Sequence, residues 1–204
     1  MRPRRANSQT LLSIFNGKTI QVGVIYVDLV ESTDAVSRMK PSAVRAYYTT
    51  FTNEMIQVII DFGGYFLKPL GDAVVGFFPA FRGFVNQADN VVNCGLIMIE
   101  LCKNSISPLF VRKRLPKISC RVGADFGTVE VVKLGVQSTG YFVDMVGNTM
   151  NIAAKIMKKA GANELLIGDQ LSKVIHTTYR LSCSRIGSLP LPSPYAYYKV
   201  GFVL

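Results

Sequence analysis

Residues 22–33 read VGVIYVDLVEST, an apolar and β-branched run that predicts a buried strand ending at Asp28. Residues 63–78 read GGYFLKPLGDAVVGFF, which predicts two short strands joined by a tight Leu-Gly turn, with Asp72 at its tip. Acids beside strand residues of this kind are costly to desolvate, and a divalent cation held between them offsets that cost. The two stretches therefore predict a metal site built on Asp28 and Asp72.

The remaining elements follow from hydrophobic spacing. Apolar residues recur at helical intervals over 44–62 and 84–102, and a basic, proline-containing connection over 107–117 is expected to end the second helix. Further elements are expected as strands over 118–126 and 129–134, a short strand after Tyr141, a helix from near Gly147 and a last strand over 195–200. This order predicts an α+β fold, a ferredoxin-like βαββαβ sandwich with helices on one face of a mostly antiparallel sheet and extra C-terminal strands.

Length and composition predict one domain. The 204 residues, 49% of them hydrophobic, suffice for one substantial core over 19–204, and residues 1–18 are expected to be a flexible basic tail or the stub of a linker. No apolar run approaches the roughly 18 to 20 residues that span a bilayer, so we expect a soluble, cytoplasmic protein without a transmembrane segment. Scattered cysteines and a single histidine, His176, encode neither a zinc site nor a disulfide framework.

The net charge of +10 is concentrated in two places. The first twenty residues carry four basic residues, and residues 103–121 carry six basic residues and no acid. The remainder is balanced, so these are local patches and not a basic surface. We interpret them as solvated tail and loop; contact with RNA or with a membrane surface, and attraction of anionic nucleotides, are the alternatives.

A third stretch, residues 141–160, reads YFVDMVGNTMNIAAKIMKKA and places Asp144 before a helix that carries Asn151 and Lys155. The motifs VDLVEST, KPLGD and DMVGNTMNIAAK occur in this order along the chain. Together they resemble the catalytic domain of the class III nucleotidyl cyclases, the adenylate and guanylate cyclase family, over residues 19–200. Each motif alone is weak, whereas three in this order are specific.

The resemblance implies a two-metal site. Asp28 and Asp72 would hold two Mg²⁺ or Mn²⁺ ions with the Leu29 carbonyl as an additional ligand, and the backbone amides of Glu31, Ser32 and Thr33 would cradle a triphosphate. Hard cations prefer such oxygen ligands and bridge phosphate oxygens. Taken singly, each aspartate could instead be a loop or turn residue.

The resemblance also implies that Lys68 and Asp144 recognise the base. One cationic donor beside one carboxylate acceptor complements adenine, which offers an acceptor at N1 and a donor at N6, whereas guanine presents the opposite pattern. The pair therefore predicts ATP as the substrate. The alternatives are a solvated strand lysine for Lys68 and a helix cap for Asp144.

By the same resemblance, Asn151 would orient the ribose, and Lys155 stands where catalytic members usually carry arginine. Lysine keeps the charge but not the planar fork, and one lost donor at a developing oxyanion can cost roughly 3 to 4 kcal/mol. The enzyme is then expected to be slow, not inactive.

In the resembled family, the metal aspartates of one protomer face the base- and ribose-binding residues of the other, so we expect a homodimer. The predicted function is an adenylate cyclase that makes cyclic AMP and pyrophosphate from ATP. The main alternative is a cyclase-like, nucleotide-binding module with weak or no activity, and a cyclic pyrimidine product is also possible. An RNA-binding module lacks the aromatic strand motif it needs, and a diguanylate cyclase is disfavoured by Tyr65 and Phe66, which follow Gly63-Gly64 where that family carries acids.

Overall fold

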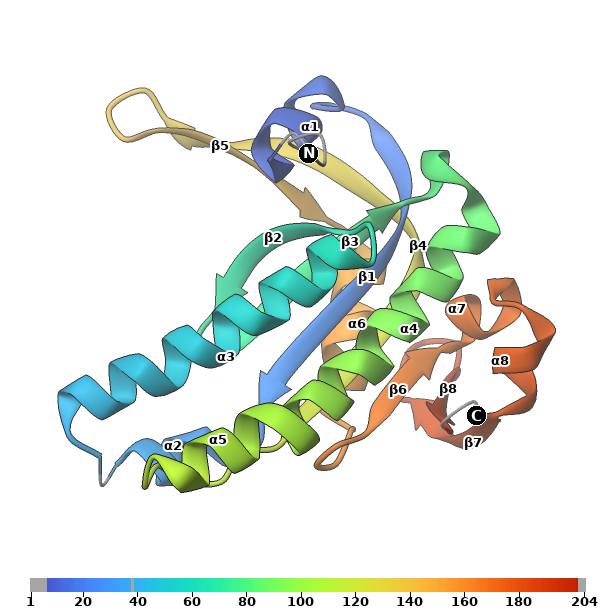
Figure 1. Ribbon diagram of the computed structural model, residues 1–204. Helices are drawn as coiled ribbons and strands as arrows, with labels where there is room; N and C mark the ends of the chain where they lie inside the picture. Colours follow the sequence, from blue (N-terminus) through green and yellow to red (C-terminus); the bar gives the residue numbers. More distant parts are fainter. Residues whose placement is uncertain (1–6, 38, 202–204) are drawn as a thin grey trace.

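The computed structural model describes residues 7–37 and 39–201. Its centre is the predicted ferredoxin-like unit, in which the sheet runs in the order β2-β3-β1-β4 with antiparallel neighbours. The unit comprises β1 (Thr19–Leu29), α3 (Pro41–Asp61), β2 (Tyr65–Leu70), β3 (Ala73–Pro79), α4 (Phe84–Leu101) and β4 (Cys120–Val136). Helices α3 and α4 run side by side across one face of this sheet (Figure 1). The α+β fold class and the hairpin that carries Asp72 are thus confirmed.

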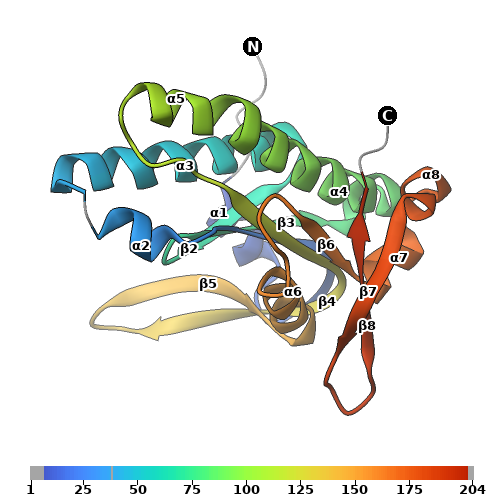
Figure 2. The ribbon, with the colours of Figure 1, turned by 90° about the horizontal axis from the view of Figure 1, so that it is seen from below.

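Helices cover both faces of the sheet, so the prediction of a single helical face is wrong. Along β1, Ile25 and Val27 pack in the cluster that contains α3 and α4, whereas Val24 and Tyr26 pack in a second cluster on the opposite face. Helix α6 (Asn148–Met157) covers that second face (Figure 2). A strand that is apolar at consecutive positions needs such a cover on each side.

Helix α6 lies very close to β4. A Cβ atom on Gly123 would lie 2.2 Å from the backbone nitrogen of Met157, so only glycine permits this approach. The packing fixes α6 against the strand that runs beside Asp28.

The sequence predicted a flexible tail over residues 1–18. Residues 8–14 instead form helix α1 (Ser8–Ile14). The Asn7 side chain accepts a hydrogen bond from the Thr10 amide and caps the helix. Leu12 is fully buried, and Gln9 exchanges two hydrogen bonds of 2.8 Å with the backbone of Val143. These contacts tie α1 to the second face of the sheet; residues 1–6 lie outside the described part of the chain.

The basic connection after α4 is helical, contrary to the prediction. Helix α4 continues through a π-helical turn, η2 (Cys102–Ile106), into α5 (Ser107–Arg112). Pro108 stands at the start of α5, directly after the π-helical turn, and a π-turn is a point at which a helix can change its hydrogen-bond pattern without ending. Among the described residues, the combined helix Phe84–Arg112 has the length and hydropathy of a membrane span, with half of its most apolar window buried inside the domain.

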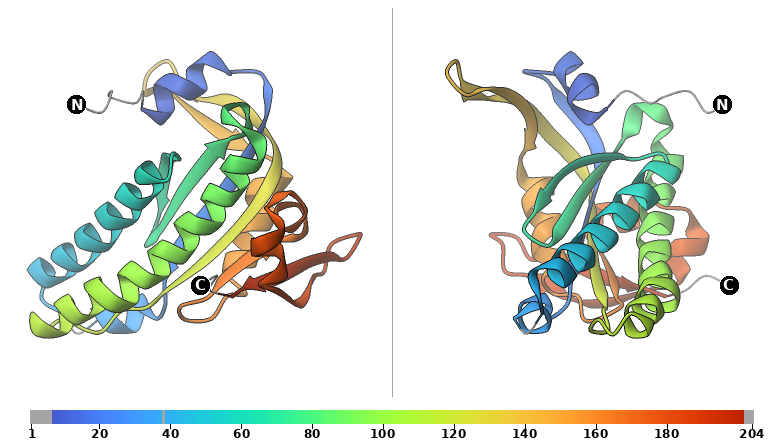
Figure 3. Two further views of the ribbon diagram at one scale, coloured as in Figure 1. Left: turned by 45° about the vertical axis from the view of Figure 1, so that its right-hand side comes forward. Right: turned by 60° about the vertical axis from the view of Figure 1, so that its left-hand side comes forward.

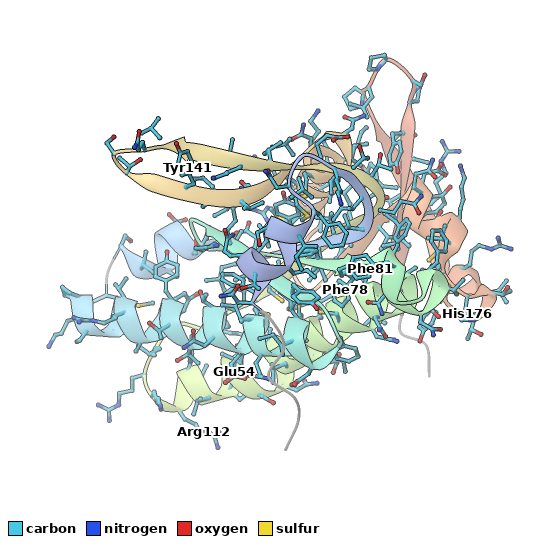
Figure 4. The ribbon with its side chains drawn as sticks, turned by 90° about the horizontal axis from the view of Figure 1, so that it is seen from above. Glu54, Phe78, Phe81, Arg112, Tyr141 and His176 are labelled. Carbon is cyan, nitrogen blue, oxygen red and sulfur yellow. The ribbon has the colours of Figure 1, made fainter. Side chains whose placement is uncertain are left out.

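The two predicted strands around Gly127 form one long strand, β4, which pairs with β5 (Gly140–Val146). Together they make an arm that extends beyond the rest of the sheet (Figures 1 and 3). Tyr141 lies toward its tip, away from the helical layer that carries Glu54 and Arg112 (Figure 4). The arm thus presents side chains from strands that helices cover only in part.

The C-terminal part extends the sheet on the other side of β4. Strand β6 pairs in parallel with β4, and β8 and β7 follow, so that the sheet has eight strands. The remaining elements are α2 (Ser32–Val36), η1 (Ala80–Arg82), β6 (Leu165–Gly168), α7 (Asp169–Val174), α8 (Thr177–Leu181), β7 (Cys183–Leu189) and β8 (Tyr195–Val200).

A buried acid joins this extension to the central sheet. Asp125 of β4 is 1% exposed and accepts hydrogen bonds from the Tyr195 hydroxyl at 2.7 Å and the Leu171 amide at 3.3 Å. Burial raises the pKa of Asp125 from 3.8 to about 6, although both hydrogen bonds oppose the rise. The protonated form is therefore favoured by folding.

This raised pKa predicts a particular pH dependence of stability. Because the folded pKa lies above the unfolded one, the contribution of Asp125 is fully present below pH 4 and is lost as the pH rises toward 6. Relative to Asp125→Asn, the free energy of unfolding of the wild type should fall by about 3 kcal/mol across that window. Urea unfolding at several pH values measures it, with Glu54→Gln on the exposed face of α3 as control. Parallel curves for wild type and Asp125→Asn would contradict the assignment.

Candidate active site

The first group of site residues surrounds Asp28, near the end of β1. The residue is 6% exposed, and its Oδ2 accepts hydrogen bonds from Arg121 Nε at 2.9 Å and Nη2 at 2.6 Å. Arg121 stands directly opposite Asp28 in the register of β1 and β4, so the ladder itself aligns the two side chains. The buried carboxylate thus has a charge partner on the neighbouring strand.

Asp72 meets Asp28 from the turn between β2 and β3. Its Oδ2 accepts a hydrogen bond from the hydroxyl of Ser32, a buried residue that begins α2. Burial raises the pKa of Asp28, Arg121 lowers it, and the charge of Asp72 and its hydrogen bond raise it again. The two predicted metal acids are therefore neighbours in one chain.

These oxygen atoms fit a divalent cation. Within residues 7–37 and 39–201 there is no group of three or more His, Cys, Asp or Glu side chains that could hold a metal, so Asp28 and Asp72 have no third side chain of these types beside them for a metal. The Leu29 side chain is buried in the core, which leaves its backbone as the part able to contribute a ligand. Mg²⁺ and Mn²⁺ are commonly bound by one or two carboxylates, with water and phosphate oxygens as the other ligands.

The loop after Leu29 leads directly into α2. Glu31 is exposed and has a φ of 56°, a left-handed conformation that is unusual for a residue with a side chain. This bend turns the chain so that Ser32 and Thr33 open the helix. The predicted phosphate-binding segment thus lies beside the paired acids.

The second group is the ion pair between Lys68 and Asp144, which joins β2 to β5. Asp144 is 5% exposed and also accepts a hydrogen bond of 2.8 Å from the Met145 amide. Burial, and then the charge of Asp144, raise the pKa of Tyr26 to about 12. The structure therefore brings the two predicted base-binding residues together.

The third group consists of Asn151 and Lys155, one turn apart on the exposed side of α6. Lys155 lines a groove of about 360 Å³ with Lys158, Lys159 and residues 189–191. These residues of the β7–β8 connection belong to the C-terminal extension. The structure thus presents Asn151 and Lys155 to solvent, on a different element from the paired acids.

Two features of the site were missed by sequence reasoning. Arg121 was counted only as part of a basic patch, and Ser32 only as a backbone donor. The arginine could be linked to Asp28 only through the register of β1 and β4, which the sequence does not specify.

Comparison with known proteins identifies the family. The model of the adenylate and guanylate cyclase catalytic domain matches residues 16–198, so the chain belongs to this family. Among curated proteins, it is 26% identical to a cytidylate cyclase of Escherichia coli over 77% of the chain and 35% of that protein. It is also 26% identical to a uridylate cyclase of Burkholderia cepacia over 74% of the chain and 65% of that protein.

Solved structures agree on the fold. An adenylyl cyclase from P. aeruginosa superposes with a TM-score of 0.82 at 21% identity, covering 91% of this chain and 95% of that one. The sequence-based resemblance to class III cyclases and the fold class are confirmed. The chain spans about a third of the length of its E. coli relative.

Arg121 and a bound cation should compete for Asp28. Arg121→Gln leaves Asp28, beside Asp72, without its guanidinium partner, so we expect Mn²⁺ to bind at least about tenfold more tightly than in the wild type. Isothermal titration calorimetry without nucleotide measures this affinity. Asp28→Asn should abolish the binding, and Arg112→Gln, a change at the end of α5, should leave it unchanged. Weaker Mn²⁺ binding in Arg121→Gln would contradict the competition.

Proposed function

We propose that this domain is a nucleotidyl cyclase that converts a nucleoside triphosphate whose base presents a ring-nitrogen acceptor beside an exocyclic amine, ATP or CTP, into its 3',5'-cyclic monophosphate and pyrophosphate. The observation that carries the proposal is the pairing of Lys68 with the buried Asp144. The supporting facts are the family, the fold and the paired acids Asp28 and Asp72.

Lys68 and Asp144 select the base through opposite hydrogen-bonding roles. The ammonium group donates to a ring nitrogen, and the carboxylate accepts from the neighbouring exocyclic amine. In adenine these groups are N1 and the N6 amine, which is why the sequence predicted ATP. Guanine and uracil present a carbonyl and a ring N–H there, so each would leave a buried polar group unpaired.

CTP is the second candidate, because cytosine presents an acceptor at N3 beside the N4 amine, the same pattern that adenine offers. The specific observation that favours it is that two curated relatives of this chain are cytidylate cyclases, of Escherichia coli and Staphylococcus aureus. The pair thus favours bases with a ring acceptor beside an amine over bases with a ring N–H beside a carbonyl.

The reaction needs charge neutralisation and alignment. The O3'–Pα bond forms, the bond from Pα to the pyrophosphate oxygen breaks, and the proton of the 3'-hydroxyl passes to water. Asp28 and Asp72 would hold divalent cations, which would supply activation of the hydroxyl and neutralisation of the leaving group. Arg121, which donates to Asp28 in the free protein, would then be free to approach the phosphates. Glu31, Ser32 and Thr33 offer backbone amides to the same group.

On α6, Asn151 orients the ribose and Lys155 meets the charge that develops on the α-phosphate. Lysine acts there as a single point charge, without the bidentate geometry of arginine. The lysine at position 155 therefore supports slow turnover. The same lysine is the one sequence feature that favours the alternative of a catalytically weak, nucleotide-binding module.

Both halves of the site act together in a homodimer under this proposal. Asp28 lies near the end of β1 and Asp72 in the turn between β2 and β3, whereas Asn151 and Lys155 are exposed on α6. In the dimer, Asn151 and Lys155 of one protomer contact the substrate that the acids of the other protomer bind. The β4–β5 arm supports pairing, because it exposes several large apolar side chains. They are Leu134, Val136, Tyr141, Phe142 and Val146. Such exposure is typical of an interface.

The substrate prediction is tested by incubating the domain with each of the four nucleoside triphosphates and Mn²⁺, and identifying products by mass spectrometry. We expect a cyclic product from ATP, CTP or both, at a kcat/KM at least about 100-fold above those for GTP and UTP. Asp28→Asn should abolish product without loss of fold. A preference for GTP or UTP would contradict the role of Lys68 and Asp144, and nucleotide binding without any product would favour the inactive module.

The dimer is tested by mixing two inactive variants. Asp28→Asn and Asn151→Ala damage opposite halves of the site, so each mixed dimer keeps one intact site. An equimolar mixture should recover about a quarter of the wild-type activity by statistical pairing. The matched control mixes Asp28→Asn with Asp72→Asn, which damage the same half and should recover nothing. No recovery in the first mixture would contradict sites shared between protomers.

A further inference from the structure

A large cavity lies next to the candidate active site and shares Glu31 with it. It has a volume of about 1450 Å³ and is walled by the α2–α3 connection on one side and the α5–β4 connection on the other. The residues Asp28, Asp72, Lys68 and Asp144 do not line it, whereas Glu31 lies in its wall. The cavity is wide enough for a metabolite of nucleotide size.

The charge of the wall favours an anion. Four basic residues line the cavity, against the two acids Glu31 and Asp34. The basic residues are Lys40, Lys113, Arg114 and Lys117. In the part of the chain that the structure describes, none of the four forms an ion pair. Cations that converge on a concave surface without an internal partner are a recurrent feature of phosphate sites.

The backbone around the cavity is held in costly conformations. Three non-glycine residues in the described ranges have left-handed φ values, namely Glu31 at 56°, Arg114 at 58° and Asn163 at 58°, and all three line this cavity. Such conformations cost free energy and cluster at ligand sites and switches. They come from three segments distant in sequence, so no single turn accounts for them.

Asn163 adds an unsatisfied polar atom. Its backbone amide donates to the Cys120 carbonyl at 2.7 Å, which fixes the residue against β4. Its side-chain Oδ1 is buried and has no hydrogen-bond donor among the described residues. A buried acceptor of this kind is normally satisfied, and a ligand hydroxyl or amine in the cavity would satisfy it after a small rotation of the amide.

We propose that this cavity is a second ligand site, which binds a phosphate-bearing metabolite separately from the cyclase substrate. The lysines and Arg114 hold the phosphate, and Asn163 contacts the remainder of the ligand. The source of the phosphate is either an organic phosphate such as a nucleoside monophosphate or a free polyphosphate such as pyrophosphate.

The test uses isothermal titration calorimetry with AMP and with pyrophosphate in EDTA, so that no divalent cation supports binding at Asp28 and Asp72. Wild-type protein should bind at least one probe, and the probe that binds distinguishes the two sources. Lys113→Gln/Lys117→Gln should weaken the binding at least about tenfold. The matched control, Lys18→Gln/Lys103→Gln, removes two exposed lysines outside the cavity and should change the affinity less than about twofold.

A second variant protects the test against misfolding. Asn163→Asp keeps a residue type that tolerates left-handed φ and places a negative charge in the wall, so it should weaken binding as well. Arg121→Gln, which removes the arginine of the candidate active site, should bind the probe like the wild type. The proposal is overturned if neither probe binds, if the cavity variants bind as tightly as the wild type, or if Arg121→Gln alone loses the binding. Because no turnover is measured, these outcomes are independent of the proposed cyclase activity.

Discussion

The buried carboxylate of Asp28 is the constraint on which the site depends. It ends a strand whose apolar residues are covered on both faces, so its charge lies where desolvation is costly. Arg121 offsets this cost from the opposite position on β4, at 2.6 Å. The cover formed by α6, the long β4 strand and the hairpin that carries Asp72 all help to hold this acid in position.

The hydrophobic pattern sufficed to predict the centre of the fold and part of the site. The alternation along β1 and the Leu-Gly turn place Asp28 and Asp72 at strand ends, and local patterns of this kind are encoded within a few residues. The pairing of Lys68 with Asp144 followed from family resemblance and was not derivable from spacing. The roles of Asn151 and Lys155 remain predictions.

What the sequence could not predict depends on long-range contacts. The register that places Arg121 opposite Asp28 joins segments 93 residues apart. Helix α1 is short and depends on the burial of Leu12 and on Gln9 bonding to β5, neither of which has a local signal. Pro108 suggested a break after α4, yet the π-turn before it lets the helix continue. In each case tertiary structure overrides the local signal.

The two ion pairs share a consequence for substrate binding. Asp28 is paired with Arg121 and Asp144 with Lys68, so each buried acid is already neutralised within one chain. Under the proposed function, a cation would replace Arg121 at Asp28, Arg121 would turn to the phosphates, and the base would bind between Lys68 and Asp144, so each acid would exchange one partner for another. An exchange of partners avoids the desolvation cost of creating a new buried charge. In the free protein these two acids therefore have cationic partners within the same chain, while the neighbouring charge of Asp72, which accepts a hydrogen bond from Ser32, still raises the pKa of Asp28.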